Sequence, residues 1–119
     1  MDSFAVLRKT IFCDIDGTIF KYRKFETMRD EKAELIDGIQ AYLQIESEKG
    51  AHIVITTARP EKLRGFTEYE LSENDIPYDQ LVMGIGRGVR ILINDSEFED
   101  IPRAIAIPIK RNQSINECL

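Results

Sequence analysis

A pair of aspartates separated by a single residue is the part of the sequence best suited to chemistry. Asp14 and Asp16 lie in the sequence DIDGT (14–18), directly after the apolar and β-branched run 10–13. Two carboxylates this close repel each other unless a cation neutralises them, and Mg²⁺ is a hard cation that takes oxygen ligands. One carboxylate can then attack phosphorus, while the other gives a proton to the leaving alkoxide and later activates water.

A calcium loop and an ordinary acidic turn are the alternatives to this interpretation. A calcium loop needs further oxygen ligands at short, regular spacing. Ile19 and Phe20 follow the motif and offer none. Gly17 allows a sharp turn after the aspartates, and Thr18 is placed to hold the nearby carboxylate.

The elements that must position these residues alternate between strands and helices. Strands are expected at 10–13, 53–56, 89–93 and 104–107, with a brief apolar run at 81–83, and helices at 34–49 and after Pro60. This alternation predicts an α/β fold with a three-layer, Rossmann-like parallel sheet and helices on both of its faces. The length of 119 residues fits one domain, 1–119.

Polar residues follow three of the expected strands. Thr56 ends the second and Thr57 follows it, and Asn94 and Asp95 follow the run 89–93. Ligands of parallel sheets bind beyond the carboxyl ends of the strands. We therefore expect these residues to meet Asp14 at one edge of the sheet.

Composition limits the classes of protein to consider. The formal charge of −5 argues against a dedicated nucleic-acid-binding module, which has a basic face. No apolar run is long enough to cross a membrane, and the first residues do not resemble a secretory signal. The two cysteines, Cys13 and Cys118, are far apart in the sequence. These features predict a reduced, cytoplasmic protein.

The sequence FCDIDGTIF resembles the first motif of the haloacid dehalogenase (HAD) superfamily, DxDGT after a hydrophobic strand. The resemblance implies that Asp14 is the nucleophile and Asp16 the general acid/base. It also implies a Mg²⁺ cofactor bound by Asp14 and by the backbone carbonyl of Asp16. A second aspartate at position 16 is typical of the phosphatases in this superfamily.

The matches to the second and third motifs are less specific. IVITTARPE resembles the second, which places phosphate binding on Thr57, although strand length alone also allows Thr56. Arg59 is expected either to touch substrate or to pair with an acidic neighbour. The third motif is a Lys or Arg that neutralises phosphate. Related small phosphatases carry Gly-Lys-Pro there, whereas this chain has GIGRG (84–88), so the candidates are Arg87 first, then Arg90, Lys62 and Arg64.

The fourth motif provides the last acidic metal ligand. ILINDSEFED resembles it, with Asn94-Asp95 where many relatives have two aspartates. Asp95 is the expected ligand, and Asn94 is a spacer or a donor behind it. If Asn94 stands at the ligand position instead, its amide oxygen binds the metal more weakly. Glu99 and Asp100 are expected to assist.

Neither of the two usual insertion points is long enough for a cap domain, so the resemblance implies a minimal, capless core. Capless relatives act on large or protruding substrates, or complete their sites through contacts in a homo-oligomer. Residues 20–25 would form a short flap over the site. Within it, Lys21, Arg23 and Lys24 are placed to steer an anionic substrate toward Asp14.

The sequence therefore predicts a Mg²⁺-dependent phosphomonoester hydrolase that forms an aspartyl-phosphate. The expected substrate is a small phosphorylated metabolite, such as a sugar phosphate or an intermediate of polysaccharide metabolism. A polynucleotide 3′-phosphatase is an alternative that the acidic charge disfavours. A non-catalytic regulatory domain is another, favoured by the irregular third motif and by Asn94.

Overall fold

A computed structural model describes residues 7–97 and 100–119, and a three-stranded parallel sheet lies at its centre. The strands β1 (Thr10–Cys13), β2 (His52–Thr56) and β3 (Gln80–Val82) are arranged in the order β1-β2-β3. Cys13 pairs with Ile55, and Ile55 pairs with Leu81. The carboxyl ends of the strands therefore meet at one edge, and the predicted α/β fold with a parallel sheet is confirmed.

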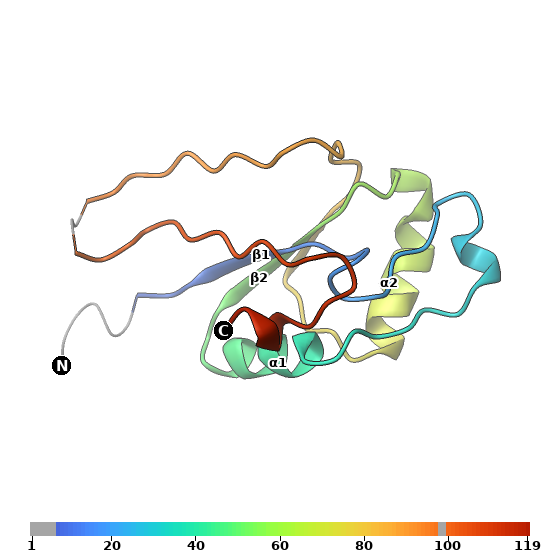
Figure 1. The fold of residues 1–119 in the computed structure, drawn as a ribbon, viewed down its shortest axis with the longest axis horizontal. Coiled ribbons are helices and arrows are strands. Elements are labelled where there is room, and N and C mark those ends of the chain that lie inside the picture. Colours follow the sequence, from blue (N-terminus) through green and yellow to red (C-terminus); the bar gives the residue numbers. More distant parts are fainter. Residues whose placement is uncertain (1–6, 98–99) are drawn as a thin grey trace.

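Two α-helices connect the strands in turn (Figure 1). The helices are α1 (Ile39–Glu48), between β1 and β2, and α2 (Arg64–Glu73), between β2 and β3. Helix α1 begins five residues later than the predicted start at 34, because residues 34–36 are bonded to the flap instead. The backbone of Lys21 donates to Glu34 (2.8 Å), and that of Ile36 donates to Ile19 (2.8 Å). Gly50, with a φ of 94°, follows the helix as predicted.

Three short 3-10 helices complete the regular structure of the described residues. They are η2 (Met28–Asp30), η3 (Glu61–Leu63) and η4 (Ile115–Glu117). The first lies in the connection from the flap to α1, the second leads directly into α2, and the third lies close to the C-terminus. Among the described residues, no helix is long and apolar enough to cross a membrane.

The main core lies on one face of the sheet. Ile53 and Ile55 of β2 pack there with Leu43 of α1 and Leu71 of α2, and all four are at most 2% exposed. On the opposite face, Phe12 and Val82 remain 59% and 41% exposed. The sequence predicts helices on both faces, whereas within the described ranges both α-helices contribute to the first.

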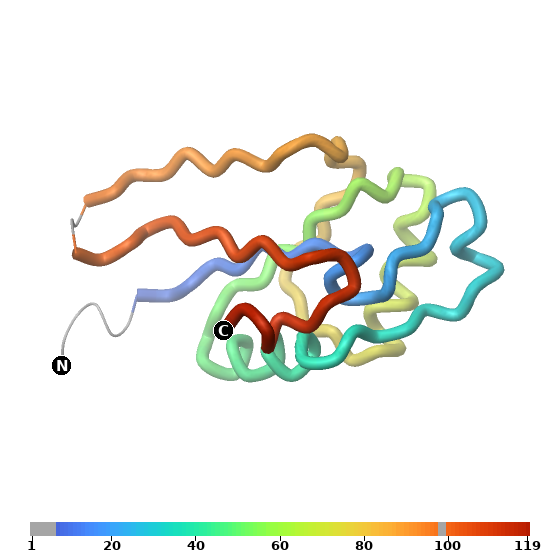
Figure 2. The backbone as a smooth tube through the Cα atoms, in the orientation of Figure 1, coloured from blue at the N-terminus to red at the C-terminus, as the bar shows by residue number. Residues whose placement is uncertain are grey.

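Residues 84–108, which we call the arm, start at the carboxyl edge of the sheet and then extend away from this body (Figure 1). Figures 1 and 2 show two long legs without helix or strand, one running away from the carboxyl edge of the sheet and the other returning. Val89 and Ile93 are 86% and 92% exposed. The Cα radius of gyration is 15.3 Å, against roughly 13–14 Å for a compact chain of this length.

The predictions of strands at 89–93 and 104–107 are therefore wrong for this structure. Backbone hydrogen bonds hold the start of the arm at the carboxyl edge, from Gly84 to Arg59 (2.8 Å) and from Ile85 to Thr57 (3.0 Å). A parallel strand must begin at the opposite edge, which requires a crossover of a dozen or more residues. The few residues between Ile85 and Val89 do not provide one.

Candidate active site

Asp14 stands at the carboxyl end of β1, on a tight loop that the DIDGT sequence forms. The backbone nitrogen of Ile19 donates to Ile15 (2.7 Å), and that of Gly17, with a φ of 88°, donates to Phe20 (2.8 Å). The Asp14 side chain stays accessible to solvent, and no basic side chain within the described ranges forms an ion pair with it. The loop thus presents one unpaired carboxylate at the edge of the sheet.

The surroundings of Asp14 disfavour the charged form of its carboxyl group. Partial burial raises the pKa of this carboxyl above its ordinary value, and the negative charge of Asp16 acts in the same direction. The Ile15 backbone N–H and the positive charges of Arg90 and Arg59 oppose the increase without cancelling it. A cation or a positively charged ligand beside Asp14 would therefore be stabilised.

Asp16 has a different environment, because Arg59 grips both of its carboxylate oxygens. Arg59 Nε donates to Oδ2 (3.0 Å) and Nη2 donates to Oδ1 (2.9 Å), in the planar fork typical of Arg–carboxylate pairs. Arg59 is fully buried. Although burial lowers the pKa of Arg59, its bonds to Asp16 and Glu70 more than offset that effect and raise it. Arg59 was expected either to touch substrate or to pair with an acidic neighbour. The structure shows it paired with Asp16 and Glu70.

The same network extends to the flap through Glu70 of α2. One oxygen of Glu70 accepts from Arg59 (3.0 Å) and from Arg23 (2.8 Å), and the hydroxyl of Thr67 accepts a further bond from Arg59 (3.0 Å). Arg23 is 6% exposed, so it does not face solvent as the prediction of substrate steering required. Two buried cations and two carboxylates with little exposure thus tie the flap, α2 and the DIDGT loop together.

Thr57 lies directly after β2 and is 1% exposed. Its hydroxyl oxygen accepts from the backbone nitrogen of Arg59 (3.1 Å), which leaves its own proton free to donate. Thr56, the last residue of β2, is half-buried, and so is Thr18 in the DIDGT loop. The phosphate-binding role of Thr57 or Thr56 and the supporting role of Thr18 stay predictions.

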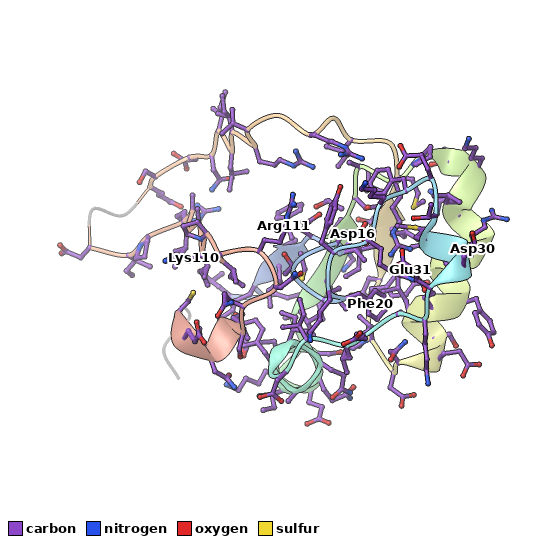
Figure 3. All side chains as sticks on the ribbon, turned by 45° about the vertical axis from the view of Figure 1, so that its right-hand side comes forward. Asp16, Phe20, Asp30, Glu31, Lys110 and Arg111 are labelled. Atoms are coloured by element: carbon purple, nitrogen blue, oxygen red, sulfur yellow. The ribbon has the colours of Figure 1, made fainter. Side chains whose placement is uncertain are left out.

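The C-terminal segment packs against the DIDGT loop, which the sequence pattern did not indicate. The backbone nitrogen of Asn112 donates to Gly17 (2.9 Å), and its side-chain oxygen accepts from the backbone nitrogen of Tyr22 (2.7 Å). The Arg111 guanidinium lies 3.9 Å from the centroid of the Tyr22 ring. Figure 3 shows Arg111 close to Asp16. An exposed cation from the end of the chain therefore flanks the loop.

The flap borders a hollow of about 480 Å³, lined by both signs of charge. Lys21, which pairs with Glu34 (3.3 Å), is exposed, as is Lys24. These two lysines keep the accessibility that substrate steering requires. The hollow is lined by Lys21, Tyr22, Arg23, Glu31, Lys32, Glu34 and Asn112.

The four candidates for the third motif have separate environments. Arg87 lies over the Phe25 ring of the flap, 4.3 Å from its centroid, and Arg90 bonds the carbonyls of Gly86 and Gly88. Arg64 is engaged with Glu61 (2.8 Å) and Lys62 is exposed. Of the four, only Arg90 contributes to the shift in the pKa of Asp14.

The structure does not bring Asn94, Asp95 and Asp100 to Asp14. Asn94 donates to the carbonyl of Arg103 (3.0 Å), and the Asp95 carboxylate lies 3.7 Å from the Arg103 guanidinium, both in the outer part of the arm. Asp100 is exposed on the returning leg, and Glu99 lies outside the described residues. The expected ligand thus stands apart from the site.

The residues that meet at the site do not by themselves make the expected Mg²⁺ site. In the described part of the chain, no group of three His, Cys, Asp or Glu side chains is arranged to hold a metal. Both oxygens of Asp16 are taken by Arg59, so only the Asp14 carboxylate and backbone oxygens remain nearby. A further acidic side chain must come from elsewhere to complete the set.

Two functional candidates escaped the sequence analysis. Glu70 shares the buried side of α2 with Leu71 and Thr67. A charged residue on an apolar helix face requires a buried partner, and that pattern was the available signal. Nothing in the sequence around Arg111 pointed to the DIDGT loop, because the contact depends on where the chain returns.

Comparisons with known proteins found solved structures with a similar fold. No protein-family model matches the chain, and no curated protein is similar enough to count as a match. The solved Pnkp1/Rnl/Hen1 complex contains a chain with 24% identity to this one and a TM-score of 0.60, covering 76% of this chain and 32% of that one. A second structure, of the Pnkp1/Rnl/Hen1 RNA repair complex, has 24% identity, a TM-score of 0.59 and coverage of 76% and 29%.

A structural-genomics target from Vibrio cholerae has 19% identity and a TM-score of 0.54, covering 80% of this chain and 90% of that one. This chain spans about a third of the length of the Pnkp1/Rnl/Hen1 chains. At these identities the likeness establishes a shared α/β fold.

Proposed function

We propose that the chain is a phosphatase that transfers the phosphoryl group of a phosphomonoester to Asp14 and then to water. The observation that carries the proposal is the division between its two aspartates. Asp14 is accessible and forms no ion pair with any described residue, which leaves it available as a nucleophile, whereas Asp16 is fixed by a buried arginine. An acidic turn with only a structural role would not require one aspartate to be accessible and the other to be fixed.

In the proposed reaction, an oxygen of Asp14 attacks phosphorus, and the bond from phosphorus to the leaving oxygen breaks. The leaving alkoxide takes a proton from Asp16. Water then attacks the acyl phosphate, the bond between Asp14 and phosphorus breaks, and Asp16 recovers its proton from the water. The free hydroxyl proton of Thr57 is available for a phosphoryl oxygen.

Arg59 supports this sequence as a positioning residue. Its two bonds fix the orientation of the Asp16 carboxylate, and its own position is fixed by Thr67 and Glu70. For Asp16 to carry a proton, one bond to Arg59 has to lengthen. We therefore expect substrates with a good leaving group, which need no proton, to react fastest.

Dependence on Mg²⁺ remains part of the proposal. The cation would balance the Asp14 carboxylate and the phosphoryl oxygens. The described part of one chain does not bring three acidic side chains together, and the steps above use the chain's own residues.

The test is hydrolysis of an aryl phosphate by the intact chain, with added Mg²⁺ and with chelator. The Asp14→Asn variant should lose at least about 1000-fold in kcat, because it removes the nucleophile. Asp75→Asn is the matched control. It makes the same chemical change at an exposed residue after α2, at a φ of 53° that asparagine adopts readily.

Equal loss in both variants would assign the effect to folding rather than to the nucleophile. Absence of turnover by the folded wild-type chain, on aryl phosphate and on a panel of phosphorylated metabolites and oligonucleotides, would overturn the proposal. The non-catalytic regulatory domain would then be favoured.

A polynucleotide 3′-phosphate is the second candidate substrate, against the expectation from net charge. Two observations support it: the exposed cations Lys21, Lys24 and Arg111 around the DIDGT loop, and the likeness in fold to chains of an RNA repair complex. A base can also stack on an aromatic side chain such as Tyr22.

Competition between a 3′-phosphorylated oligonucleotide and a sugar phosphate separates the two candidates. If the oligonucleotide is preferred, Arg111→Gln should raise its KM several-fold, whereas Arg8→Gln, at the far edge of the sheet, should not. A preference for the sugar phosphate, unaffected by either variant, would remove the polynucleotide candidate.

A further inference from the structure

No described residue pairs with the outer edge of β1 through its backbone. The strand is at the end of the β1-β2-β3 order, and no backbone hydrogen bond joins it to any described residue of the arm. Phe12 in its middle is 59% exposed. Proteins normally cover or charge such an edge, because it is a template for another strand.

The arm carries a segment suited to that edge. Its residues 89–93 read Val-Arg-Ile-Leu-Ile and have neither helix nor strand structure. Ile91 and Ile93 are 78% and 92% exposed. β-Branched residues favour strands, and contiguous exposed apolar side chains mark interaction surfaces. The chain thus presents an unpaired edge and an unpaired strand-forming segment.

Strand β1 and the run 89–93 are both followed directly by polar residues. The apolar run of β1 ends at Asp14, and the run 89–93 ends at Asn94 and Asp95. Parallel pairing would place Asp95 at the carboxyl edge beside Asp14, whereas antiparallel pairing would place it at the opposite edge. Parallel pairing is therefore the arrangement that adds a carboxylate where the site lacks one.

A chain cannot make this parallel pairing with its own arm. Strands lie about 4.8 Å apart and rise about 3.3 Å per residue, so the start of a fourth strand beside β1 is roughly 20 Å from the end of β3. Ile85 is bonded to Thr57 at the carboxyl edge. The four residue steps from Ile85 to Val89 span at most about 14 Å.

We propose that two copies of this chain exchange arms, so that residues 89–93 of each copy pair in parallel with β1 of the other and bring Asp95 beside the other copy's Asp14. The exchange is reciprocal and needs one two-fold axis. It covers the edge of β1 and buries Phe12 and the apolar face of the arm.

The exchange completes the site as well as the sheet. Asp95 of one copy and Asp14 of the other would together offer the oxygen ligands that Mg²⁺ prefers. This second part of the proposal rests on the proposed function, whereas the exchange of arms does not. Arg87 stays with its own body through Phe25, since the arm diverges after it.

The decisive experiment is cross-linking between differently tagged chains, in a Cys118→Ser background. The remaining Cys13 is buried, and burial raises the pKa of its thiol to about 12, so it will not compete. Thr10→Cys in one chain should form a disulfide with Ile91→Cys in the other, because these positions pair when Asp95 lies beside Asp14. Asn94→Cys is the matched control, because it would meet Thr10→Cys only in antiparallel pairing.

Three results would overturn the exchange, and none of them requires enzymatic activity. One is a disulfide with the position 94 variant in place of the position 91 variant. Another is a disulfide inside a single chain that carries both substitutions. The third is a molecular mass in solution that stays at that of one chain up to high concentration, where we expect twice that value.

Completion of the site has its own test. Mg²⁺ should tighten the dimer several-fold, because a ligand bound only by the dimer stabilises it. Asp95→Asn should abolish this effect and leave dimerisation without Mg²⁺ unchanged. If Mg²⁺ has no effect on the wild-type dimer, the shared site is wrong even where the arms exchange.

Mixing two inactive variants provides the link to catalysis. Asp14→Asn and Asp95→Asn chains, mixed in equal amounts, form one intact site in each mixed dimer, so about a quarter of wild-type activity should return. Cross-linked dimers without this recovery would retain the exchange and reject the role of Asp95. No activity in the wild-type chain would count against the proposed function alone.

Discussion

The body and the arm each contain an apolar, β-branched run, but only the run in the body forms a strand. In the body, the run 53–56 becomes a buried strand between two others, with Ile53 and Ile55 fully covered. In the arm, the run 89–93 is just as apolar and stays exposed. The comparison teaches that an apolar, β-branched run specifies a strand only where the chain can deliver it to a neighbour.

The connections account for the difference. Residues 57–79 between β2 and β3 include η3 and α2, which allow the chain to return to the amino edge of the sheet. The arm begins with two backbone bonds to the carboxyl edge and has no helix to carry it back. Matched substitutions in the two regions test this contrast.

Removing the buried cation of the body should cost more stability than any change in the arm. Arg59→Met leaves the carboxylates of Asp16 and Glu70 with little exposure and without their shared partner. We expect a loss of about 3–5 kcal/mol in the free energy of unfolding, measured by urea denaturation.

Arg103→Met is the control, because Arg103 pairs with Glu97 and Asp95 in the exposed arm. It should leave the unfolding midpoint of the dilute chain unchanged. Similar losses in the two variants would show that the arm is packed as the body is.

Truncation of an apolar side chain should likewise lower the free energy of unfolding in the body and leave it nearly unchanged in the arm. Leu43→Ala opens a cavity under α1 and should cost about 2–5 kcal/mol. Ile93→Ala removes a 92% exposed side chain and should change the stability of the dilute chain by less than about 0.5 kcal/mol.

Repeating this pair of measurements at high concentration sharpens the contrast. If arms exchange, Ile93→Ala becomes destabilising as the wild-type chain dimerises, while the cost of Leu43→Ala is already present. An Ile93→Ala cost that is large at every concentration would mean that the arm docks within its own chain.

Neutralising Asp14 should stabilise the body at neutral pH. The pKa of this carboxyl is raised in the folded chain above its ordinary value of 3.8, so folding opposes its charge. Above that raised value, Asp14→Asn should therefore increase the free energy of unfolding slightly, by less than about 1 kcal/mol, because solvent screens this exposed side chain. As pH falls through the raised value toward 3.8, the carboxyl of the wild-type chain binds its proton and the gain should vanish.

Asp95→Asn makes the same change in the arm, where the side chain is 74% exposed. It should have no effect on the dilute chain at either pH. A gain from Asp14→Asn that is constant across pH would contradict the electrostatic explanation.

Much of the body followed from sequence, because its signals are local. The run 10–13, its abrupt end at Asp14 and the turn at Gly17 are all readable within a few residues, and β1, β2 and the DIDGT loop lie where they were expected. The helix before β2 was placed too early, since residues 34–36 bond to the flap instead of to the next turn.

The features that the sequence did not predict depend on contacts between distant parts of the chain. Whether 89–93 forms a strand depends on the connection that precedes it, and the position of Asp95 depends on that strand. The bidentate pair of Arg59 with Asp16 was one of two open alternatives, because sequence spacing does not reveal which side chains share a buried space. Arg111 reaches the DIDGT loop only through the return of the arm.

The smallest effect concerns the boundary between the two regions. The Arg87 guanidinium lies 4.3 Å from the centroid of the Phe25 ring, so it tethers the root of the arm to the flap. A cation–π contact at an exposed site contributes about 0.5–1 kcal/mol. A double-mutant cycle of Phe25→Leu and Arg87→Gln should therefore give a coupling energy in that range, whereas Phe25→Leu with Arg103→Gln should give none. Coupling within error of zero for the first pair would place the start of the free arm before Arg87, so that only the backbone bonds of Gly84 and Ile85 hold its root to the body.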